Sequence, residues 1–267
     1  KNTKTIKIKK LFFKKKKKKE NLYQKVFKTL KKEKFCIIKN FHSLNDHKKI
    51  LNFFKKKFHF KKDIRFSGPR RIRQGDYQRL DIGNTYKNPR FIRTIYVNEW
   101  LKKNENFFKL IEPIINIRNY VSKTKKSSKF YPEAKSISNS LNEKKYLFCD
   151  FVRMIQYPSG GGFLAEHNDH DKYYCKGVYQ ALLPLTVKKL KKKKKQNLAS
   201  YESGGLYLRF KNKKKLYLDD YLEASDLLLF DPRLMHGIDS VDIMKKLNLN
   251  NLNGRLTLAF SISNFLK

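Results

Sequence analysis

Residues 163–171 read FLAEHNDHD, which places two histidines and two aspartates within five positions. Side chains two residues apart in a β-strand point to the same face, so a strand here would direct His167 and Asp169 into one space. An imidazole beside a carboxylate supplies two of the three ligands of a facial triad for non-haem iron. The pair alone is a weak pattern, and it predicts a metal site only if a third ligand is found. The other polar residues of the stretch are expected at the rim of the site or in solvent: Glu166, Asn168, His170 and Asp171.

The third ligand would have to come from elsewhere in the chain, and only His236 lies downstream among the histidines. It follows a buried-looking apolar run, residues 227–230, and a proline turn. A barrel could return this strand end to the side of His167. The alternative is a loop histidine with no role, and the residues alone leave both open. The remaining histidines are expected to be surface or boundary residues without a ligand role: His42, His47 and His59.

A second candidate feature is the alternating segment GRLTLAFSIS, residues 254–263. Arg255 shares one face with small and polar residues, and the other face is fully apolar. One interpretation is a strand with one wet face and one core face. The other is that the small polar face lines a cavity, in which the guanidinium of Arg255 grips a carboxylate in bidentate fashion.

Tyr157 and the triplet Gly160–Gly162 precede the histidine cluster. A phosphate-binding loop would need a Lys-Ser/Thr pair after the glycines, and none follows, so the triplet predicts a tight turn. Tyr157 is either a core residue or presents its hydroxyl to the same cavity as Arg255.

The elements that must position these residues fall into three regions. Residues 1–22 are a basic tail, expected to be mobile. Residues 23–142 form a helical and irregular support region, with a strand at 34–41, a helix opened by the capping sequence SLND, an irregular Arg-rich part at 61–95 and a second helix at 97–123. Residues 143–267 hold short strands separated by turns, which is typical of an all-β sandwich or barrel, with Lys/Asn insertions at 188–197 and 244–253. The expected fold is therefore α+β, mainly β, with an N-terminal helical layer.

Composition limits the function classes. The chain has 267 residues, 40% of them apolar and 14% aromatic, enough for a sizeable core. The net charge of +40 favours nucleic acid as a partner, but it comes from lysine runs, and no RNP strand or GxxG clamp is present, so we favour a solvated surface. Three scattered cysteines indicate a reduced, intracellular and cytoplasmic protein. No apolar run is long enough to span a membrane, and no secretory signal is found.

The chain from about 145 to 265 resembles the Fe(II)- and 2-oxoglutarate-dependent dioxygenase superfamily, and most of all its prolyl hydroxylase-like branch. The resemblance is carried, in order, by R-x-x-x-Y-P-x-G-G-G-F-L-x-x-H-x-D, a Gly-Gly-Leu strand, LEASDLLLFDPRLMHGIDSV and GRLTLAFSIS. The H-x-D pair is weak by itself, whereas the ordered set with the distal histidine and the following arginine is specific. Residues 1–140 resemble the family only as a helical N-terminal layer.

The resemblance implies a double-stranded β-helix, or jelly roll, and a site for Fe(II) made by His167, Asp169 and His236. It also implies that Arg255, helped by Tyr157, binds the far carboxylate of 2-oxoglutarate. The expected reaction is hydroxylation of a small-molecule or peptidyl substrate with O₂ as cosubstrate, releasing succinate and CO₂; ascorbate remains open as a further cofactor.

One departure concerns the spacing of His236 and Arg255, which are 19 positions apart, whereas members of the family commonly have about half that spacing. The extra Lys/Asn segment is expected to loop out. Two alternative functions remain. One is a basic nucleic-acid-binding protein that uses the barrel as a scaffold, suggested by the lysine runs and by Arg70, Arg71 and Arg73. The other is a cupin-like metalloenzyme that does not use 2-oxoglutarate.

Overall fold

The computed structural model describes residues 19–65, 77–83, 88–97, 105–122, 129–130, 148–169, 178–189, 200–210 and 214–264. The helices in these ranges are α1 (Lys19–Glu33), α2 (Leu44–Lys57) and α4 (Glu105–Ser122), with 3-10 turns η1 (Phe60–Lys62) and η3 (Leu218–Asp220). The strands are β1 (Phe35–Ile38), β2 (Asp63–Arg65), β3 (Tyr77–Gly83), β4 (Arg90–Tyr96), β5 (Lys129–Phe130), β6 (Phe148–Tyr157), β7 (Gly162–His167), β8 (Gln180–Pro184), β9 (Val187–Lys188), β10 (Ser200–Tyr201), β11 (Gly205–Arg209), β12 (Lys215–Tyr217), β13 (Leu227–Phe230), β14 (Met235–Val241) and β15 (Arg255–Asn264).

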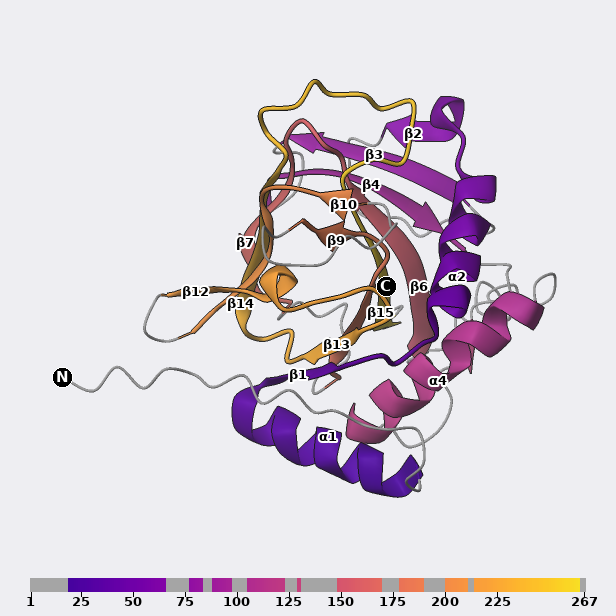
Figure 1. The fold of residues 1–267 in the computed structure, drawn as a ribbon, viewed down its shortest axis with the longest axis vertical. Coiled ribbons are helices and arrows are strands. Elements are labelled where there is room, and N and C mark those ends of the chain that lie inside the picture. Colours follow the sequence, from indigo (N-terminus) through magenta and orange to yellow (C-terminus); the bar gives the residue numbers. More distant parts are fainter. Residues whose placement is uncertain are drawn as a thin grey trace, which may run out of the picture.

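Most of the strands form one curled, mainly antiparallel sheet, so the expectation of a mainly β fold is confirmed. Its strand order is β1-β13-β8-β15-β6-β4-β7-β14-β11-β12. In addition, β3 pairs with β2 and with β4, and β5 pairs with β6. The sheet curls so far that β6 and β7, which follow each other in the chain, lie in opposite walls (Figure 1). The interior of the curl is the space in which side chains from both walls meet.

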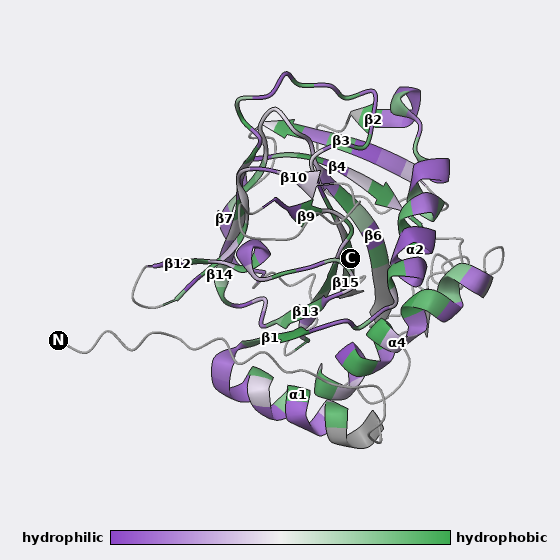
Figure 2. Ribbon diagram, in the orientation of Figure 1, coloured by the Kyte–Doolittle hydropathy of each residue, from purple (hydrophilic) through white to green (hydrophobic). Residues whose placement is uncertain are grey.

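The helices α1, α2 and α4 cover the outside of one wall, as the expected helical layer (Figure 1). Each helix has a hydrophobic and a hydrophilic side (Figure 2). Two apolar cores result. One lies between the helices and the sheet and contains Ile50, Ile111 and Leu258, and the other lies inside the curl and contains Ile155, Leu228 and Ile238.

Strand β15 contributes to both cores because its two faces are buried on opposite sides of the sheet. Its apolar face joins the core under the helices. Its small polar face is buried as well, with Arg255 2% and Thr257 1% exposed. The interpretation with one wet face is therefore wrong, since Ala259 and Ser261 on the same face are also only 2% exposed.

The N-terminal elements match the expectations in part. β1 and α2 form where the sequence predicts them, and the Ser43 side chain caps α2 by accepting a hydrogen bond from the Asp46 backbone N–H at 3.1 Å. The second helix is α4, residues 105–122; the expected start at 97–104 falls mostly outside the described residues. The expectation of an irregular 61–95 is wrong for the described parts of this region, because β2, β3 and β4 lie there; residues 66–76 and 84–87 lie outside the described residues. Arg79 and Arg93 on these strands are buried in ion pairs, with Asp81 at 2.8 Å and with Asp63 at 2.6 Å, so a charged sequence did not mean a surface position here.

Strand β1 ties the N-terminal region to the end of the chain. It pairs with β13 in antiparallel register, from Phe35 opposite Phe230 to Ile38 opposite Leu227. Just after β1, Lys39 is 5% exposed and its ammonium lies 2.5 Å from the buried Asp226 carboxylate. The division of the chain at residues 22 and 142 rests on sequence composition and remains a proposal. In the structure, strands from both sides of residue 142 belong to one sheet.

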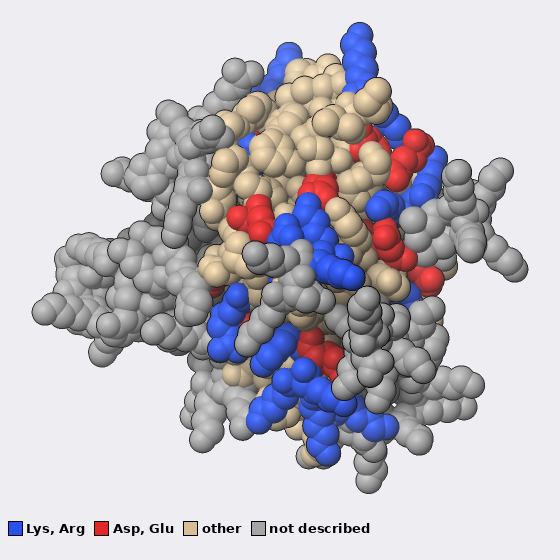
Figure 3. Space-filling model, turned by 90° about the vertical axis from the view of Figure 1, so that its left-hand side faces the viewer, with Lys and Arg blue, Asp and Glu red and all other residues tan. Residues whose placement is uncertain are grey.

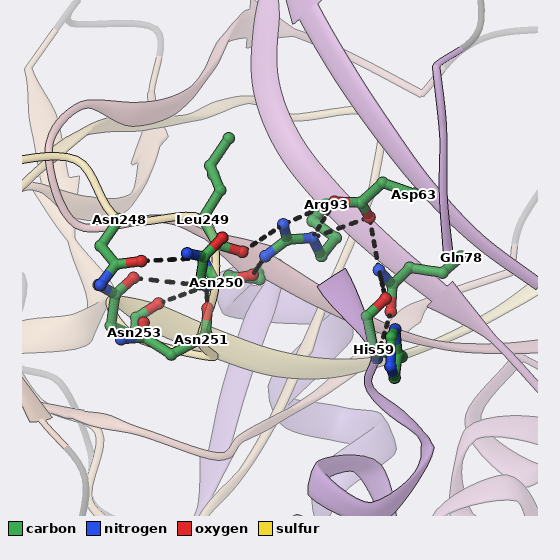
Figure 4. Close-up of polar contacts among 10 residues, drawn as sticks. His59, Asp63, Gln78, Arg93, Asn248, Leu249, Asn250, Asn251 and Asn253 are labelled. Atoms are coloured by element: carbon green, nitrogen blue, oxygen red, sulfur yellow. Dashed lines mark hydrogen bonds and ion pairs between the residues drawn. The ribbon is translucent and has the colours of Figure 1, made fainter. Parts of the chain in front are cut away.

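The Lys/Asn insertion at 244–253 leaves the sheet between β14 and β15 as expected, but it is anchored (Figure 4). Arg93 on β4 is fully buried and donates to the Asp63 carboxylate, to the Gln156 side-chain oxygen at 2.6 Å and to the Leu249 carbonyl at 2.7 Å. The Gln156 amide in turn donates to the backbone carbonyl of Asn253 at 2.8 Å. The buried side chains of Arg93 and Gln156 thus anchor the segment 244–253, for which composition alone predicts a loop that extends away from the sheet.

Replacing Arg93 with lysine is expected to lower the free energy of unfolding by about 2 kcal/mol. A single ammonium cannot reach acceptors spread over three sides of the guanidinium, so buried acceptors lose their donors. Urea denaturation measures the change. The control Arg233→Lys changes a guanidinium that is 55% exposed and pairs with Asp231, and it is expected to cost less than about 1 kcal/mol because water can reach the altered side chain. Equal, small losses in both variants would contradict the anchoring role of Arg93.

His47 lies on the inner side of α2 and is fully buried, so its expected surface position is wrong. Its Nε2 lies 3.3 Å from the Leu185 carbonyl oxygen, and its Nδ1 has no hydrogen-bond partner within the described part of the chain. Burial lowers the pKa of His47 below its usual range, although the contact with the Leu185 carbonyl opposes the shift. The imidazole is therefore neutral in the folded protein near pH 7.

This burial predicts a pH dependence of stability. As the pH falls below about 6.5, the unfolded chain takes up a proton at His47 before the folded chain does, so the free energy of unfolding decreases, by at most about 1.4 kcal/mol per pH unit. His47→Leu is expected to show less of this loss between pH 7 and 5, whereas His59→Leu, which changes an exposed histidine, is expected to match the wild type. Thermal unfolding across this pH range measures the difference, and identical pH profiles for all three proteins would rule out the assignment.

The surface charge is partly neutralised in pairs. Figure 3 shows the face on the side of β7, β12 and β14, where Lys and Arg side chains gather with Asp and Glu side chains beside them. Arg209 on β11 lies 2.6 Å from Glu166 on β7, and Lys215 on β12 lies 2.8 Å from Asp239 on β14. Glu166 is thus paired rather than simply solvated. The arginine cluster at 70–73 and most of the insertion at 188–197 lie outside the described residues. None of the helices described is long and apolar enough to cross a membrane.

Candidate metal centre

The two predicted histidine ligands lie directly opposite each other on neighbouring strands. His167 is the last residue of β7, and His236 is the second residue of β14. The antiparallel register pairs the two, and their ring centroids are 4.3 Å apart. The register slips by one residue just beyond this pair, between His236 and Ile238, and such a bulge re-aims side chains at the end of a strand. The two histidines are therefore neighbours in space, although β8 to β13 lie between them in the sequence.

Both imidazole rings are held by their own backbone. The Nδ1 atom of His167 lies 2.8 Å from the Ala165 carbonyl oxygen, and the Nδ1 atom of His236 lies 2.8 Å from the Leu234 carbonyl oxygen. A carbonyl oxygen only accepts hydrogen bonds, so each Nδ1 carries the proton and each Nε2 presents a lone pair. This arrangement is common among metal-binding histidines, because it fixes both the tautomer and the direction of the ring.

Asp169 supplies the carboxylate between the two rings. Its Oδ1 is 3.6 Å from the Nε2 of His167, and its Oδ2 is 3.7 Å from the Nε2 of His236. The ligand atoms of the three residues all lie within 4.8 Å of one another, and in the described residues this is the one such group that could hold a metal ion. The structure therefore brings together the three residues that the sequence predicts as ligands.

Strand parity predicts that His167 and Asp169 lie together, and they do, although β7 ends at His167 and Asp169 lies two residues beyond it. The Asp169 backbone N–H instead donates to the Pro232 carbonyl at 2.9 Å, in the turn that leads to His236. Asn168 is exposed, as expected for the opposite face. His170 and Asp171 lie outside the described residues, so their expected place at the rim stays a prediction.

The electrostatics prepare these groups as ligands near neutral pH. Burial alone would raise the pKa of Asp169, but the contact with His167 and the charge interactions with both histidines outweigh it and lower the pKa to about 2. Burial, together with the nearby His167, lowers the pKa of His236 to about 4. The carboxyl group is thus ionised and the His236 imidazole neutral, which are the forms that bind metal ions.

Arg255 is the first residue of β15, and Tyr157 is the last residue of β6. The two lie side by side in the interior of the curl, at the end of these strands that points away from the histidines. They are direct neighbours in the register of the two strands, and the guanidinium carbon lies 5.3 Å from the centre of the Tyr157 ring. Both residues are buried. Tyr157 thus belongs to the core inside the curl, with its ring beside the guanidinium of Arg255.

The structure adds a partner for Arg255 that the sequence did not suggest. The Asp219 carboxylate accepts from Arg255 Nε at 2.7 Å and from Nη2 at 3.1 Å, and it also accepts from the Tyr201 hydroxyl at 2.6 Å. Burial alone would raise the pKa of Asp219, but the charge of Arg255 outweighs it and lowers the pKa. The Nη1 atom of Arg255 is buried without a hydrogen-bond partner among the described residues.

A second residue missed in the sequence is Gln180 on β8. Its side-chain amide donates to Oδ2 of Asp169. In the sequence, Gln180 stands out only as the one strongly polar side chain of the otherwise apolar segment VYQALLPL, residues 178–185. Asp219 carried no such signal, since it lies in the acidic turn LYLDDY, which reads as a surface loop.

The sequence matches no protein-family model and no curated protein. Solved structures with a similar fold include a prolyl hydroxylase from Trichoplax adhaerens in complex with a peptide fragment of the hypoxia inducible factor oxygen degradation domain. The identity is 15%, the TM-score is 0.50, and the match covers 91% of this chain and 90% of that one. They also include the non-heme alpha ketoglutarate dependent epimerase SnoN from nogalamycin biosynthesis, at 8% identity and a TM-score of 0.51, covering 91% of this chain and 83% of that one. The protein therefore shares the overall fold of these two enzymes.

Proposed function

We propose that the protein is a non-haem Fe(II)- and 2-oxoglutarate-dependent dioxygenase with a double-stranded β-helix core. The observation that carries the proposal is the convergence of two Nε2 atoms and one ionised carboxylate on a common point. Two imidazoles and a carboxylate are the donor set of facial iron sites, which leave positions open for cosubstrates. The similarity of the fold to that of a prolyl hydroxylase and of an alpha ketoglutarate dependent epimerase supports the proposal of a 2-oxoglutarate-dependent reaction.

Arg255 supports 2-oxoglutarate as the cosubstrate. A guanidinium has five N–H donors, and Asp219 uses one on Nε and one on Nη2. The two Nη1 donors have no partner among the described residues and remain for an anion, which they would bind in a charge-assisted contact. A buried donor atom without a partner is costly, so the open Nη1 favours an anionic ligand at this place.

The residues of the chain would divide the work as follows. His167, Asp169 and His236 hold the metal ion, and their fixed ring tautomers keep two lone pairs aimed at it. Arg255 binds the far carboxylate of 2-oxoglutarate beside the Tyr157 ring. The apolar interior of the curl excludes water around both groups. When bound, Fe(II) and 2-oxoglutarate supply the oxidative chemistry, in which O₂ is consumed, 2-oxoglutarate becomes succinate and CO₂, and a substrate C–H bond is hydroxylated.

The substrate is proposed only as a class, a peptidyl side chain or a small molecule. The Trichoplax adhaerens enzyme was solved with a peptide, and SnoN was also solved with Fe3+, alpha ketoglutarate and nogalamycin RO, at 7% identity to this chain and a TM-score of 0.50. One fold thus accommodates both classes of ligand in those proteins, and the fold does not choose between them.

The test begins with the wild-type chain under anaerobic conditions. Adding Fe(II) and then 2-oxoglutarate is expected to produce the charge-transfer absorption of a chelated complex. Admitting O₂ is then expected to release succinate slowly even without the substrate, and only in the presence of iron. Metal binding without the absorption band and without succinate would overturn the proposal and favour a cupin-like metalloenzyme.

A further inference from the structure

We propose that Gln180 is a positioning residue for the metal centre, which it serves by holding the carboxylate of Asp169 in its ligating orientation. The inference rests on the proposed function in one respect, because it takes Asp169 as a metal ligand. Gln180 itself is not placed among the ligands. It acts through Asp169, since its side-chain amide donates a hydrogen bond to Oδ2 of that residue.

Gln180 is well placed for this role because it is fixed on a central strand. β8 pairs with both β13 and β15, and Gln180 is 8% exposed. It shares strand parity with Leu182, which belongs to the core inside the curl. Its direct neighbour in the register is Phe230, whose ring lies 5.2 Å from the ring of His236. The amide therefore reaches the site from a rigid wall that also supports one of the histidines.

Asp169 needs such support more than the two histidines do. Each histidine lies within a strand and has its ring bonded to a backbone carbonyl. Asp169 lies beyond the end of β7, where one backbone hydrogen bond to the Pro232 carbonyl holds its main chain. That bond leaves the side-chain rotamer undetermined. The contact with Gln180 selects the rotamer that directs the carboxylate between the two imidazoles.

The chemistry of the amide suits an anionic ligand. An NH₂ group donates to a carboxylate and offers it no competing acceptor, so the contact stabilises the ionised form. It engages Oδ2, while Oδ1 lies on the side of His167 at 3.6 Å from Nε2. Oδ2 also lies 3.7 Å from the Nε2 of His236, so the hydrogen bond from Gln180 holds the whole carboxylate between the two imidazoles.

The test compares Gln180→Met with a matched control. Methionine keeps the length of the side chain without its donor. The control Gln78→Met makes the same change at a buried glutamine on β3, whose amide also donates to a carboxylate, that of Asp63 at 2.5 Å, in the Arg93 cluster (Figure 4). Both variants lose a buried amide–carboxylate contact, but only one of these contacts involves the metal centre.

The probe is Mn(II) alone, titrated into the metal-free protein and followed by electron paramagnetic resonance, with circular dichroism as the check on folding. Gln180→Met is expected to weaken Mn(II) binding about 10- to 100-fold, and Gln78→Met to leave it within about twofold of the wild type. If Gln180→Met does not fold, Gln180→Leu is measured in the same way, together with the rise in unfolding temperature that Mn(II) produces.

Equal Mn(II) affinity in a folded Gln180 variant and in the control would overturn the inference. So would equal weakening in both variants, because that pattern indicates a general loss of packing. The proposed function is tested independently of this inference. If the wild-type protein binds Mn(II) but does not convert 2-oxoglutarate to succinate with iron, the oxygenase proposal is refuted, and the Mn(II) titration still decides the role of Gln180.

Discussion

Replacing His236 with alanine is expected to abolish metal binding and with it the release of succinate, while the chain stays folded. His236 supplies one of three converging donors, and its partner His167 lies directly opposite in the register, so no neighbouring strand residue can take its place. Loss of a residue that only supports a ligand costs about 10- to 100-fold in affinity, and loss of a ligand is expected to exceed that. Anaerobic Fe(II) titration and a succinate assay measure the two effects.

The control for this variant is His59→Ala, which removes an exposed histidine that is not among the three converging residues. It is expected to bind iron and release succinate like the wild type. Full succinate release by His236→Ala would show that the three converging residues are not the iron site, and the assignment of His167 and Asp169 would fall with it.

Replacing Arg255 with methionine is expected to have two large effects at once. It removes the residue proposed to bind the far carboxylate of 2-oxoglutarate, so the KM for 2-oxoglutarate should rise by more than about 100-fold. It also leaves the Asp219 carboxylate buried without its cation, which typically lowers the free energy of unfolding by about 3–5 kcal/mol. Steady-state kinetics and urea denaturation measure these effects separately.

Asp219→Asn distinguishes the two roles of Arg255. This variant breaks the same buried ion pair, so it should also be destabilised, but it keeps the guanidinium and releases the two donors that Asp219 engages. We therefore expect 2-oxoglutarate to raise its unfolding temperature more than that of the wild type, and to have no effect on Arg255→Met. If Arg255→Met kept the wild-type KM for 2-oxoglutarate, Arg255 would be a purely structural partner of Asp219.

Much of the site could be predicted from sequence because its strongest signals are local. Alternation along residues 254–263 placed Arg255 on the small and polar face of a strand, and the spacing of two placed His167 and Asp169 together. His236 was the one histidine left downstream, and the residues alone left its role open between a ligand and a loop histidine. The resemblance of these segments, taken in order, to one superfamily then fixed which residues belonged together.

The missed features depend on register between distant strands. Gln180 reaches Asp169 only because β8 lies beside β13 and β15, and no local pattern shows that neighbour relation. Asp219 belongs to an acidic turn that reads as surface, yet the turn folds inward to meet Arg255. The strands at 61–95 were missed for a similar reason, since buried ion pairs such as that of Arg79 with Asp81 make a charged sequence compatible with burial.

The pairing of β1 with β13 has a consequence for folding during synthesis of the protein. Lys39 is synthesised early, and its partner Asp226 follows 187 residues later. At about 5–20 residues per second, β1 waits on the order of 10–40 s for the strand that completes it. During that time the apolar segment FCII offers an unpaired edge to other nascent chains. The sheet is therefore expected to close only once β13 has been synthesised, slowly because its contacts join distant segments, and to depend on chaperones until then.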